Sequence, residues 1–393
     1  MMKAQVPICD ARLVLHSPQG ENDLSTHYQQ AFGRAREIAL VTAYLTDWNT
    51  KLRLNKSCAR FRLITGKDFG ITRKHACKEV LKWLPRRFKG QFLVADGIAG
   101  FHPKAVFWKE EGGRSFAIVG SSNLTNAAFV RNYEANVVSE LSDAEYKRVK
   151  TWLSRIERNC ETVSPTWLDE YAEAEFPKPS PSGQKHKVAR SDTVRVLTIK
   201  LPAPPGSKKI ISDRRHALNE FGKHRAGLVR LFRRCAKGTI SSAEFYSRLP
   251  DFWSHELGDR LQGKGFTIKG KHSDFAVLSR SVCTILNADD VDRDDVVASQ
   301  IDLLERMHVP TRRALLSEML CLFFPDSYPV LNTPVIRFRS AVRLRKIRGA
   351  SAGSDYIYLA RTLRNAIRQN PDHLAKNLAE ADAVIWLQYR NHG

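Results

Sequence analysis

The chain has 393 residues, 42% of them hydrophobic and 26% charged, which is the composition of a soluble globular protein with room for two or three domains. It contains no uninterrupted apolar run of membrane-spanning length and no basic and apolar leader at its start, so we expect neither a membrane protein nor a secreted one. The 63 Lys and Arg residues against 41 Asp and Glu give a net charge of +22. Counterion release makes nucleic acid the expected partner of such a basic chain, with anionic lipid as the alternative.

The cysteines are scattered along the chain without a CxxC pair or a Cys/His group at zinc-ligand spacing. This distribution is typical of reduced, mostly buried thiols, and it predicts a cytoplasmic protein. We expect no metal and no other cofactor. The seven cysteines are Cys9, Cys58, Cys77, Cys160, Cys235, Cys283 and Cys321.

The first 175 residues alternate apolar runs with amphipathic stretches, which predicts an α/β domain. A helix packed on the sheet is expected over residues 72–87, and Ser142 opens another through residue 156, with Glu145 in position for a capping box. A Gly-Gly turn at 112–113 joins two strands into a hairpin. The expected strands are residues 38–44, 61–64, 92–95, 105–108, 116–119 and 137–138.

Residues 176–192 have no hydrophobic periodicity and are rich in turn formers and cations, which predicts an exposed linker. Residues 193–393 are then a separate, mainly α domain with room for a small sheet, in which residues 194–199 and 275–286 have the pattern of strands. The helices expected in this domain are residues 215–235, 241–249, 293–307, 312–324, 355–368 and 373–389.

Two polar motifs flank the expected hairpin. The letters HPK at 102–104 precede its first strand, and GSSN at 120–123 follows its second. In a hairpin the start of the first strand lies beside the end of the second, and alternate residues of a strand share a face. His102, Lys104, Ser121 and Asn123 are therefore expected to converge.

This set of side chains suits phosphoryl transfer. An imidazole such as His102 can attack phosphorus, the Lys104 ammonium can neutralise the non-bridging oxygens, and hydroxyl and amide groups can orient them. Glu134, beyond the next turn, is expected to accept a hydrogen bond from the second imidazole nitrogen and fix its tautomer.

The two motifs resemble the H-x-K and G-S-x-N hallmark of the phospholipase D superfamily, and most closely its single-motif nuclease branch, which includes a metal-independent restriction endonuclease. The resemblance covers about the first 175 residues. It implies a phospholipase D-like fold, His102 as the nucleophile, Lys104, Ser121 and Asn123 as phosphate-holding groups, and Glu134 as the orienting acid. The family also has an Asp a few residues after the Lys, and Lys109 stands there in this chain.

An alternative explanation of the motifs is purely structural. His102 then caps a strand, and GSSNLT is a Ser/Asn-rich turn that leads into a helix.

Residues 145–147 spell the E-x-K of metal-dependent nucleases, but they lie inside an expected helix and fit a solvated face better.

Two clusters of cations stand in the second half of the chain, at residues 214–234 and 337–348. Such density suits contacts with the phosphates of DNA, and a solvated helix face is the alternative. The residues expected to bind DNA are Arg214, Arg215, Arg230, Arg233, Arg337, Arg339, Arg343 and Arg345.

The sequence thus favours a metal-independent phosphodiesterase that cleaves DNA, or RNA, through a phosphohistidine, in a restriction or phage-defence role. Because the chain has one H-x-K, a homodimer is expected to share one active site, so that the second histidine comes from the partner. The alternatives are a phosphatidyl transferase or phospholipase of the same superfamily, for which a membrane-lying segment is expected and not found, and a DNA-binding protein without catalysis.

Overall fold

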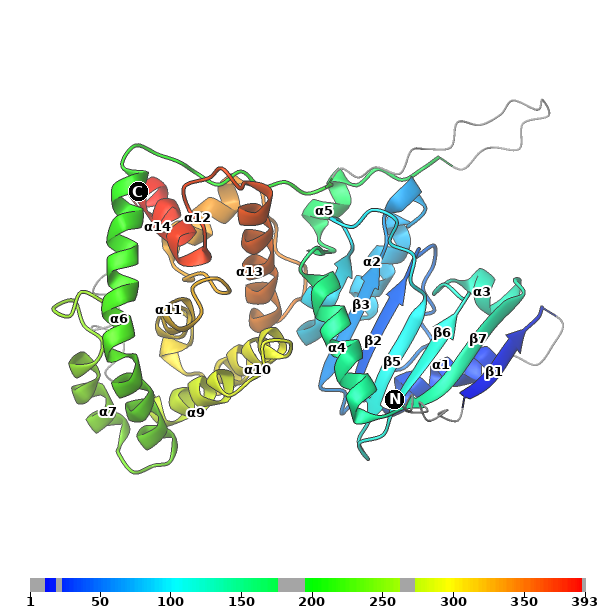
Figure 1. Ribbon diagram of the computed structural model, residues 1–393, viewed down its shortest axis with the longest axis horizontal. Helices are drawn as coiled ribbons and strands as arrows, with labels where there is room; N and C mark the ends of the chain where they lie inside the picture. Colours follow the sequence, from blue (N-terminus) through cyan, green and yellow to red (C-terminus); the bar gives the residue numbers. More distant parts are fainter. Residues whose placement is uncertain (1–10, 19–22, 176–194, 262–272, 391–393) are drawn as a thin grey trace, which may run out of the picture. The chain divides into compact units, whose positions relative to one another are not determined.

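The computed structural model describes residues 11–18, 23–175, 195–261 and 273–390, and the chain divides after Leu197 into two compact units (Figure 1). Cys9 and the predicted linker, residues 176–192, lie outside the described residues. Cysteines in the described part are free thiols, and all of these except Cys283 are buried, as predicted.

One mixed sheet forms the first unit, with the strand order β1-β7-β6-β5-β2-β3-β4-β8. Strands β2, β3 and β4 are parallel neighbours, and the other pairings are antiparallel. The six predicted strands are confirmed, whereas β1 and β8 were not predicted from the sequence. The strands are β1 Ala11–His16, β2 Ala35–Thr42, β3 Arg60–Thr65, β4 Phe92–Val94, β5 Ala105–Glu110, β6 Ser115–Gly120, β7 Glu134–Leu141 and β8 Glu161–Thr162.

Helices cover both faces of this sheet (Figure 1). Helix α4 crosses one face, where Tyr146 and Leu153 pack against Phe107 and Ala117. Its predicted capping box is confirmed, because the Ser142 hydroxyl and the Glu145 carboxylate each accept from the other's backbone N–H. The helices of this unit are α1 Asp23–Arg34, α2 Lys74–Trp83, α3 Asn126–Val130, α4 Asp143–Glu157 and α5 Pro165–Glu170, with 3-10 turns η1 Asp68–Gly70 and η2 Arg86–Gln91.

The predicted hairpin of β5 and β6 is confirmed, with Ala105 opposite Val119. Its open end carries the two polar motifs, and Gly120 N donates to Lys104 O over 3.3 Å across that end. The hairpin therefore brings residues 102–104 beside residues 120–123.

Asp96, which is buried just after β4, holds the end of the first unit in place. Its carboxylate accepts from Val196 N at 3.0 and 3.1 Å and from Leu197 N at 3.5 Å, and it also accepts from Trp167 Nε1. Residues 195–200 form no strand, so the strand predicted over residues 194–199 is wrong; residue 194 itself is not described. Their backbone donors are directed to a carboxylate instead of a neighbouring strand.

The second unit is helical, and none of its described residues, 198–261 and 273–390, forms a strand. The strand predicted over residues 275–286 is wrong, because this segment is helix α9. Asp274 caps it by accepting from Val277 N, and most of its apolar side chains are buried in the core, whereas Arg280 and Thr284 are exposed. The small sheet that the sequence allowed is likewise not found among these residues.

The other predicted helices of this unit are confirmed, although α14 begins five residues later than predicted, at an N-cap provided by Asn377. Helix α12 was not predicted from the sequence. The helices are α6 Ser207–Ala236, α7 Ser242–Arg248, α9 Phe275–Leu286, α10 Arg293–Arg306, α11 Ala314–Phe323, α12 Thr333–Ala341, α13 Ala352–Gln369 and α14 Leu378–Tyr389, with 3-10 turns η3 Leu249–Asp251 and η4 Pro310–Arg312.

Candidate active site

His102 and Lys104 lie together just before β5. Lys104 Nζ is 3.1 Å from His102 Nδ1 and 3.3 Å from His102 Nε2, and the imidazole is exposed. The predicted convergence of an imidazole and an ammonium is therefore present. A surface-exposed pair of this kind is open to an anionic ligand, for which both groups have hydrogen-bond donors or acceptors.

Asn123 is held in one orientation by the end of β2. Its Oδ1 accepts from Tyr44 N at 3.3 Å and from Thr42 Oγ1 at 3.1 Å, while Thr42 Oγ1 also accepts from Leu124 N. The Tyr44 N–H can only donate, so it fixes which end of the Asn123 amide is the oxygen. Asn123 Nδ2 has no hydrogen-bond partner among the described residues and remains a donor for a ligand.

Ser121 and Glu134 form the other side of the site. Ser121 Oγ accepts from Ala135 N at 3.0 Å and forms a short hydrogen bond to Glu134 Oε2. Asn132 Nδ2 donates to the other carboxylate oxygen at 3.1 Å. Glu134 is thus a nearly buried carboxylate at the first position of β7, with a partner for each oxygen.

The predicted hydrogen bond between Glu134 and His102 is not found. The Glu134 carboxylate is used by Ser121 and Asn132, and the imidazole nitrogens lie beside Lys104. The prediction that Glu134 orients the imidazole is therefore corrected. Glu134 holds Ser121 instead.

Gly120 shows why the second motif begins with glycine. A Cβ at this position would overlap Ala135 O and Asn136 Oδ1 on the neighbouring strand. The Asn136 amide in turn donates from Nδ2 to Ser122 Oγ at 2.8 Å, so it is fixed in the interior. The close approach of β6 and β7 places Ser121 next to Glu134.

Tyr44 contacts the proposed nucleophile directly. Its ring lies edge-on to His102, with ring centroids 5.8 Å apart. Burial raises the pKa of its phenol, and the nearby Asp68 carboxylate raises it further. Asp68 is itself buried and accepts from Gly100 N at 2.6 Å.

His16, on β1, is a second histidine, and it lies next to Glu134. It pairs across β1 and β7 with Glu134, so the two side chains share a face. The imidazole is only 5% exposed, and neither ring nitrogen has a hydrogen-bond partner. Buried polar groups without partners are rare in proteins.

The electrostatics of the site centre on Lys104. Burial lowers the pKa of Lys104, and the negative charge of Glu134 acts in the opposite direction. Within the part of the chain that the structure describes, no group of three or more His, Cys, Asp and Glu side chains could hold a metal ion. The groups present are an exposed imidazole, a cation beside it and the amide donor of Asn123.

The arginines predicted to bind DNA have different environments. Arg214 and Arg339 are buried within the second unit, where Arg214 pairs with Asp382 at 2.9 Å and Arg339 forms a two-pronged ion pair with Asp355. These two side chains hold the fold together, so their predicted DNA contacts are corrected.

Arg215 and Arg337 are also held by the second unit. Arg215 pairs with Glu380, and Arg337 donates to Tyr389 O at the end of α14. The four remaining arginines of the prediction have exposed side chains and are Arg230, Arg233, Arg343 and Arg345.

Several contributors to the site were not predicted from the sequence, namely Thr42, Tyr44 and Asn132. Thr42 and Tyr44 are about 80 residues away from Asn123, and a signal for them existed in the sequence. The strand predicted over residues 38–44 ends in polar and aromatic residues, as strands often do where they meet a site.

A family model matches the part of the chain that contains these residues. Residues 29–156 match the family described as "Cardiolipin synthase, PLD-like domain". This stretch of the chain is therefore a PLD-like domain. A comparison with curated protein sequences found no match.

Three solved structures align with parts of the chain. NucT from Helicobacter pylori is 17% identical, over 38% of this chain and 98% of its own, with a TM-score of 0.30. Nuc from Salmonella typhimurium, a phospholipase D family member, is 14% identical, over 37% of this chain and 94% of its own, with a TM-score of 0.26. The phosphatidylserine synthase of Haemophilus influenzae Rd KW20 is 14% identical, over 41% of this chain and 42% of its own, with a TM-score of 0.30.

Proposed function

We propose that the protein is a metal-independent phosphodiesterase that cleaves DNA, with His102 as the nucleophile. The observation that supports this most directly is the exposed pair of His102 and Lys104, 3.1 Å apart, next to Tyr44, whose backbone N–H holds the Asn123 amide. An imidazole nitrogen attacks phosphorus while the bond from phosphorus to the leaving oxygen breaks. Water then attacks the phosphohistidine, releases the imidazole and leaves a phosphate monoester.

Each group has a defined part in this scheme. Lys104 neutralises the non-bridging oxygens, and the Asn123 Nδ2 amide donates to one of them. Ser121 is held by Glu134 through its hydroxyl, two residues before Asn123. The charge on these oxygens is thus balanced by protein groups, which is why the reaction needs no divalent ion.

Nucleic acid is favoured over lipid because of the charge of the whole chain. The net charge of +22 suits a polyanion, and within the described residues no helix is long and apolar enough to cross a membrane. A phosphatidyl transferase remains the second candidate, since the family match is to the domain of a cardiolipin synthase. A restriction or phage-defence role is the biological setting that we propose for the nuclease.

The direct test is incubation of the purified protein with plasmid DNA in EDTA. Cleavage is expected to continue, and His102→Ala is expected to abolish it while DNA binding and the melting temperature stay close to those of the unmodified protein. Loss of cleavage in EDTA with recovery in magnesium would contradict the proposed chemistry. Turnover of a phosphatidyl substrate in vesicles, without cleavage of DNA or RNA, would favour the second candidate.

We further propose that the active unit is a homodimer with one shared active site. The leaving oxygen needs a proton from the side opposite to the attacking imidazole, and one His102 cannot occupy both sides. A row of apolar side chains on β1, β7 and β6 supports such an association. Leu13, Val137 and Val119 are cross-strand neighbours, and they and Leu15 are 40% to 68% exposed, which is typical of surfaces that oligomers bury.

Mixed dimers of unmodified and His102→Ala subunits test the shared site. If the site is shared, the mixed dimer should have far less than half the activity of the unmodified dimer, because one of the two imidazoles is missing from its single site. Charged substitutions at Leu13 and Leu15 are expected to favour monomers in sedimentation and to reduce cleavage in parallel. Half activity in the mixed dimer, or a fully active monomer, would refute the shared site.

A further inference from the structure

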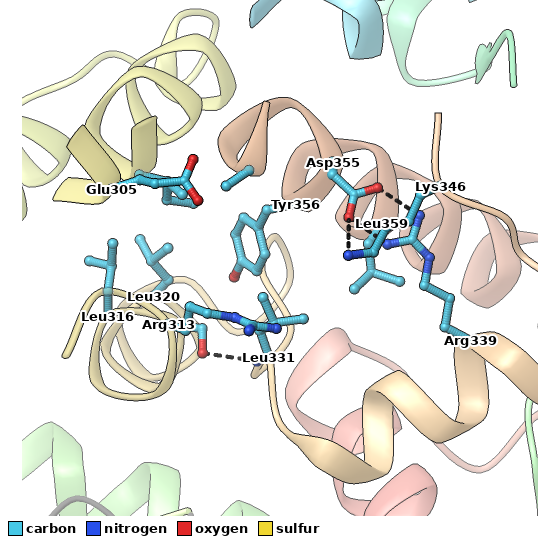
Figure 2. A pocket seen from close by; sticks show the side chains of 13 residues that line it. Glu305, Arg313, Leu316, Leu320, Leu331, Arg339, Lys346, Asp355, Tyr356 and Leu359 are labelled. Carbon is cyan, nitrogen blue, oxygen red and sulfur yellow. Dashed lines mark hydrogen bonds and ion pairs between the residues drawn. The ribbon is translucent and has the colours of Figure 1, made fainter. Parts of the chain in front are cut away.

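The second unit contains a pocket between α10, α11, α13 and the segment that leads into α12 (Figure 2). Its volume is about 190 Å³, and apolar side chains form much of its wall, among them Leu316, Leu320, Leu331 and Leu359. The Tyr356 ring also lines it, with its hydroxyl bonded to Pro329 O at 2.7 Å. The volume is below the ~300–1,000 Å³ typical of pockets for drug-sized ligands, so a smaller group is expected to fit.

One edge of the pocket is a fixed ion pair. Arg339 Nη1 and Nη2 are each 2.7 Å from an Asp355 oxygen, and Lys346 Nζ is 3.9 Å from the same carboxylate (Figure 2). Arg339 Nε also donates to Leu344 O at 2.9 Å. These bonds tie the segment after α12 to α13, so this edge is rigid, and the Asp355 charge is already balanced by Arg339.

Two exposed cations, Arg313 and Lys346, line the mouth of the pocket. Arg313 is exposed and makes no ion pair with the described residues, and Lys346 remains largely exposed despite its neighbour Asp355. Glu305 is the one other acidic residue of the lining. The segment that contributes Lys346 also has the exposed side chains of Arg343, Arg345 and Arg348. The mouth is therefore basic and the interior largely apolar.

We propose that this pocket receives a single unpaired base of the nucleic-acid substrate. This inference rests on the proposed function and names how the second unit takes part in it. A base has a flat apolar surface with polar edges. The flat surface suits the leucine and tyrosine walls of the pocket, and Arg313 lies at its mouth. The phosphates on either side of that base lie at the mouth, against Arg313 and Lys346. An acyl chain, by contrast, is longer than this cavity and gains nothing from cations at its mouth.

The test uses the full chain with His102→Ala, so that bound nucleic acid is not cut. Duplex DNA with one unpaired 2-aminopurine is titrated by fluorescence, because this base changes its emission when it leaves the stack of its neighbours. Arg313→Ala removes the free cation and Leu331→Trp fills the cavity. Arg280→Ala, which removes an exposed cation on α9 outside the pocket lining, is the matched control, and thermal melting checks that each variant is folded.

Leu331→Trp is expected to weaken binding about tenfold and to abolish the fluorescence change, since stacking is worth ~1–3 kcal/mol per base. Arg313→Ala is expected to weaken binding because a contact with a flanking phosphate is lost. Arg280→Ala should have a much smaller effect. On DNA with an abasic site in place of 2-aminopurine, Leu331→Trp should bind as well as its parent. Equal losses of binding for Leu331→Trp on both DNAs would overturn the proposal, as would unchanged binding in both variants.

A free nucleotide could use the same chemistry, so a further titration uses deoxyadenosine monophosphate alone. If the monophosphate binds in a way that Leu331→Trp abolishes, while the binding of DNA is unaffected, the pocket is a nucleotide site and the proposal for DNA is overturned. None of these measurements depends on cleavage. A failure of the proposed nuclease activity would therefore be seen separately, in the EDTA assay with the unmodified protein.

Discussion

His102 and Lys104 form a site because of local geometry. They are two residues apart on an extended segment, and the hairpin brings Ser121 and Asn123 beside them. Both relations depend on short sequence separations, so the spacing of the motifs is sufficient to predict them. The partners of Asn123 and Glu134 could not be predicted in this way, because Thr42 is 81 residues away from Asn123, and the two oxygens of Glu134 are bonded by Ser121 and Asn132 instead of His102.

The pH dependence of the reaction should report the state of Lys104. Burial lowers its pKa below the ordinary value of 10.5, so the ammonium loses its proton at a lower pH than an exposed lysine does. If the ammonium neutralises the phosphate, kcat/KM is expected to fall with rising pH from below that value. Glu134 raises this pKa, so Glu134→Gln should move the fall to still lower pH.

Lys104→Arg provides the control for this profile, because a guanidinium keeps its charge throughout the range. This variant should lose the alkaline fall even if its rate is reduced. Profiles of kcat/KM with the same alkaline midpoint in all three proteins would show that another group is titrating.

At the scale of the elements, regular patterns were predicted better than continuous apolar runs. The helix α4 shows both its periodicity and its capping box in the sequence, and it was predicted to within one residue. Residues 275–286 were predicted as a strand from their many apolar and β-branched residues, although the polar residues Arg280 and Thr284 are four apart, as on one side of a helix. Burial explains the run equally well, since α9 is enclosed by α6, α7 and α10.

The junction of β6 and β7 should tolerate no side chain at residue 120. In Gly120→Ala the new Cβ would meet Ala135 O and Asn136 Oδ1, so strands must move apart, at a cost of about 1–3 kcal/mol. Thermal or denaturant unfolding of the purified variant measures this loss. Activity should fall as well, because Ser121 directly follows β6 and Glu134 begins β7, so their hydrogen bond would be disturbed.

Gly112→Ala is the matched control in the same hairpin. Nothing lies within 4 Å of a Cβ at Gly112, and its backbone needs no left-handed conformation. Its stability should stay within about 0.5 kcal/mol of the unmodified protein. Equal stability of the two variants would mean that β6 and β7 are not packed as described.

For the whole molecule, the composition gives the net charge, but it does not show which cations are exposed and which are buried. The net charge of +22 includes Arg214 and Arg339, whose side chains are buried in ion pairs. A cluster of arginines along a helix looks the same in sequence whether its members contact solvent or an acid on another helix. The partners, Asp382 and Asp355, come from α14 and α13 and could not be assigned without the fold.

The hydrogen bonds between Asp96 and residues 196–197 determine where a stable fragment of the first unit should end. A fragment that ends at Glu175 leaves the buried Asp96 without the backbone donors of Val196 and Leu197, whereas one that ends at Leu197 keeps them. Loss of partners for a buried carboxylate costs about 1–3 kcal/mol or more. The longer fragment should therefore unfold at higher denaturant concentration and yield more soluble protein on expression. Asp96→Asn in the longer fragment should remove most of that advantage, and equal midpoints for the two fragments would show that residues 195–197 add nothing to the first unit.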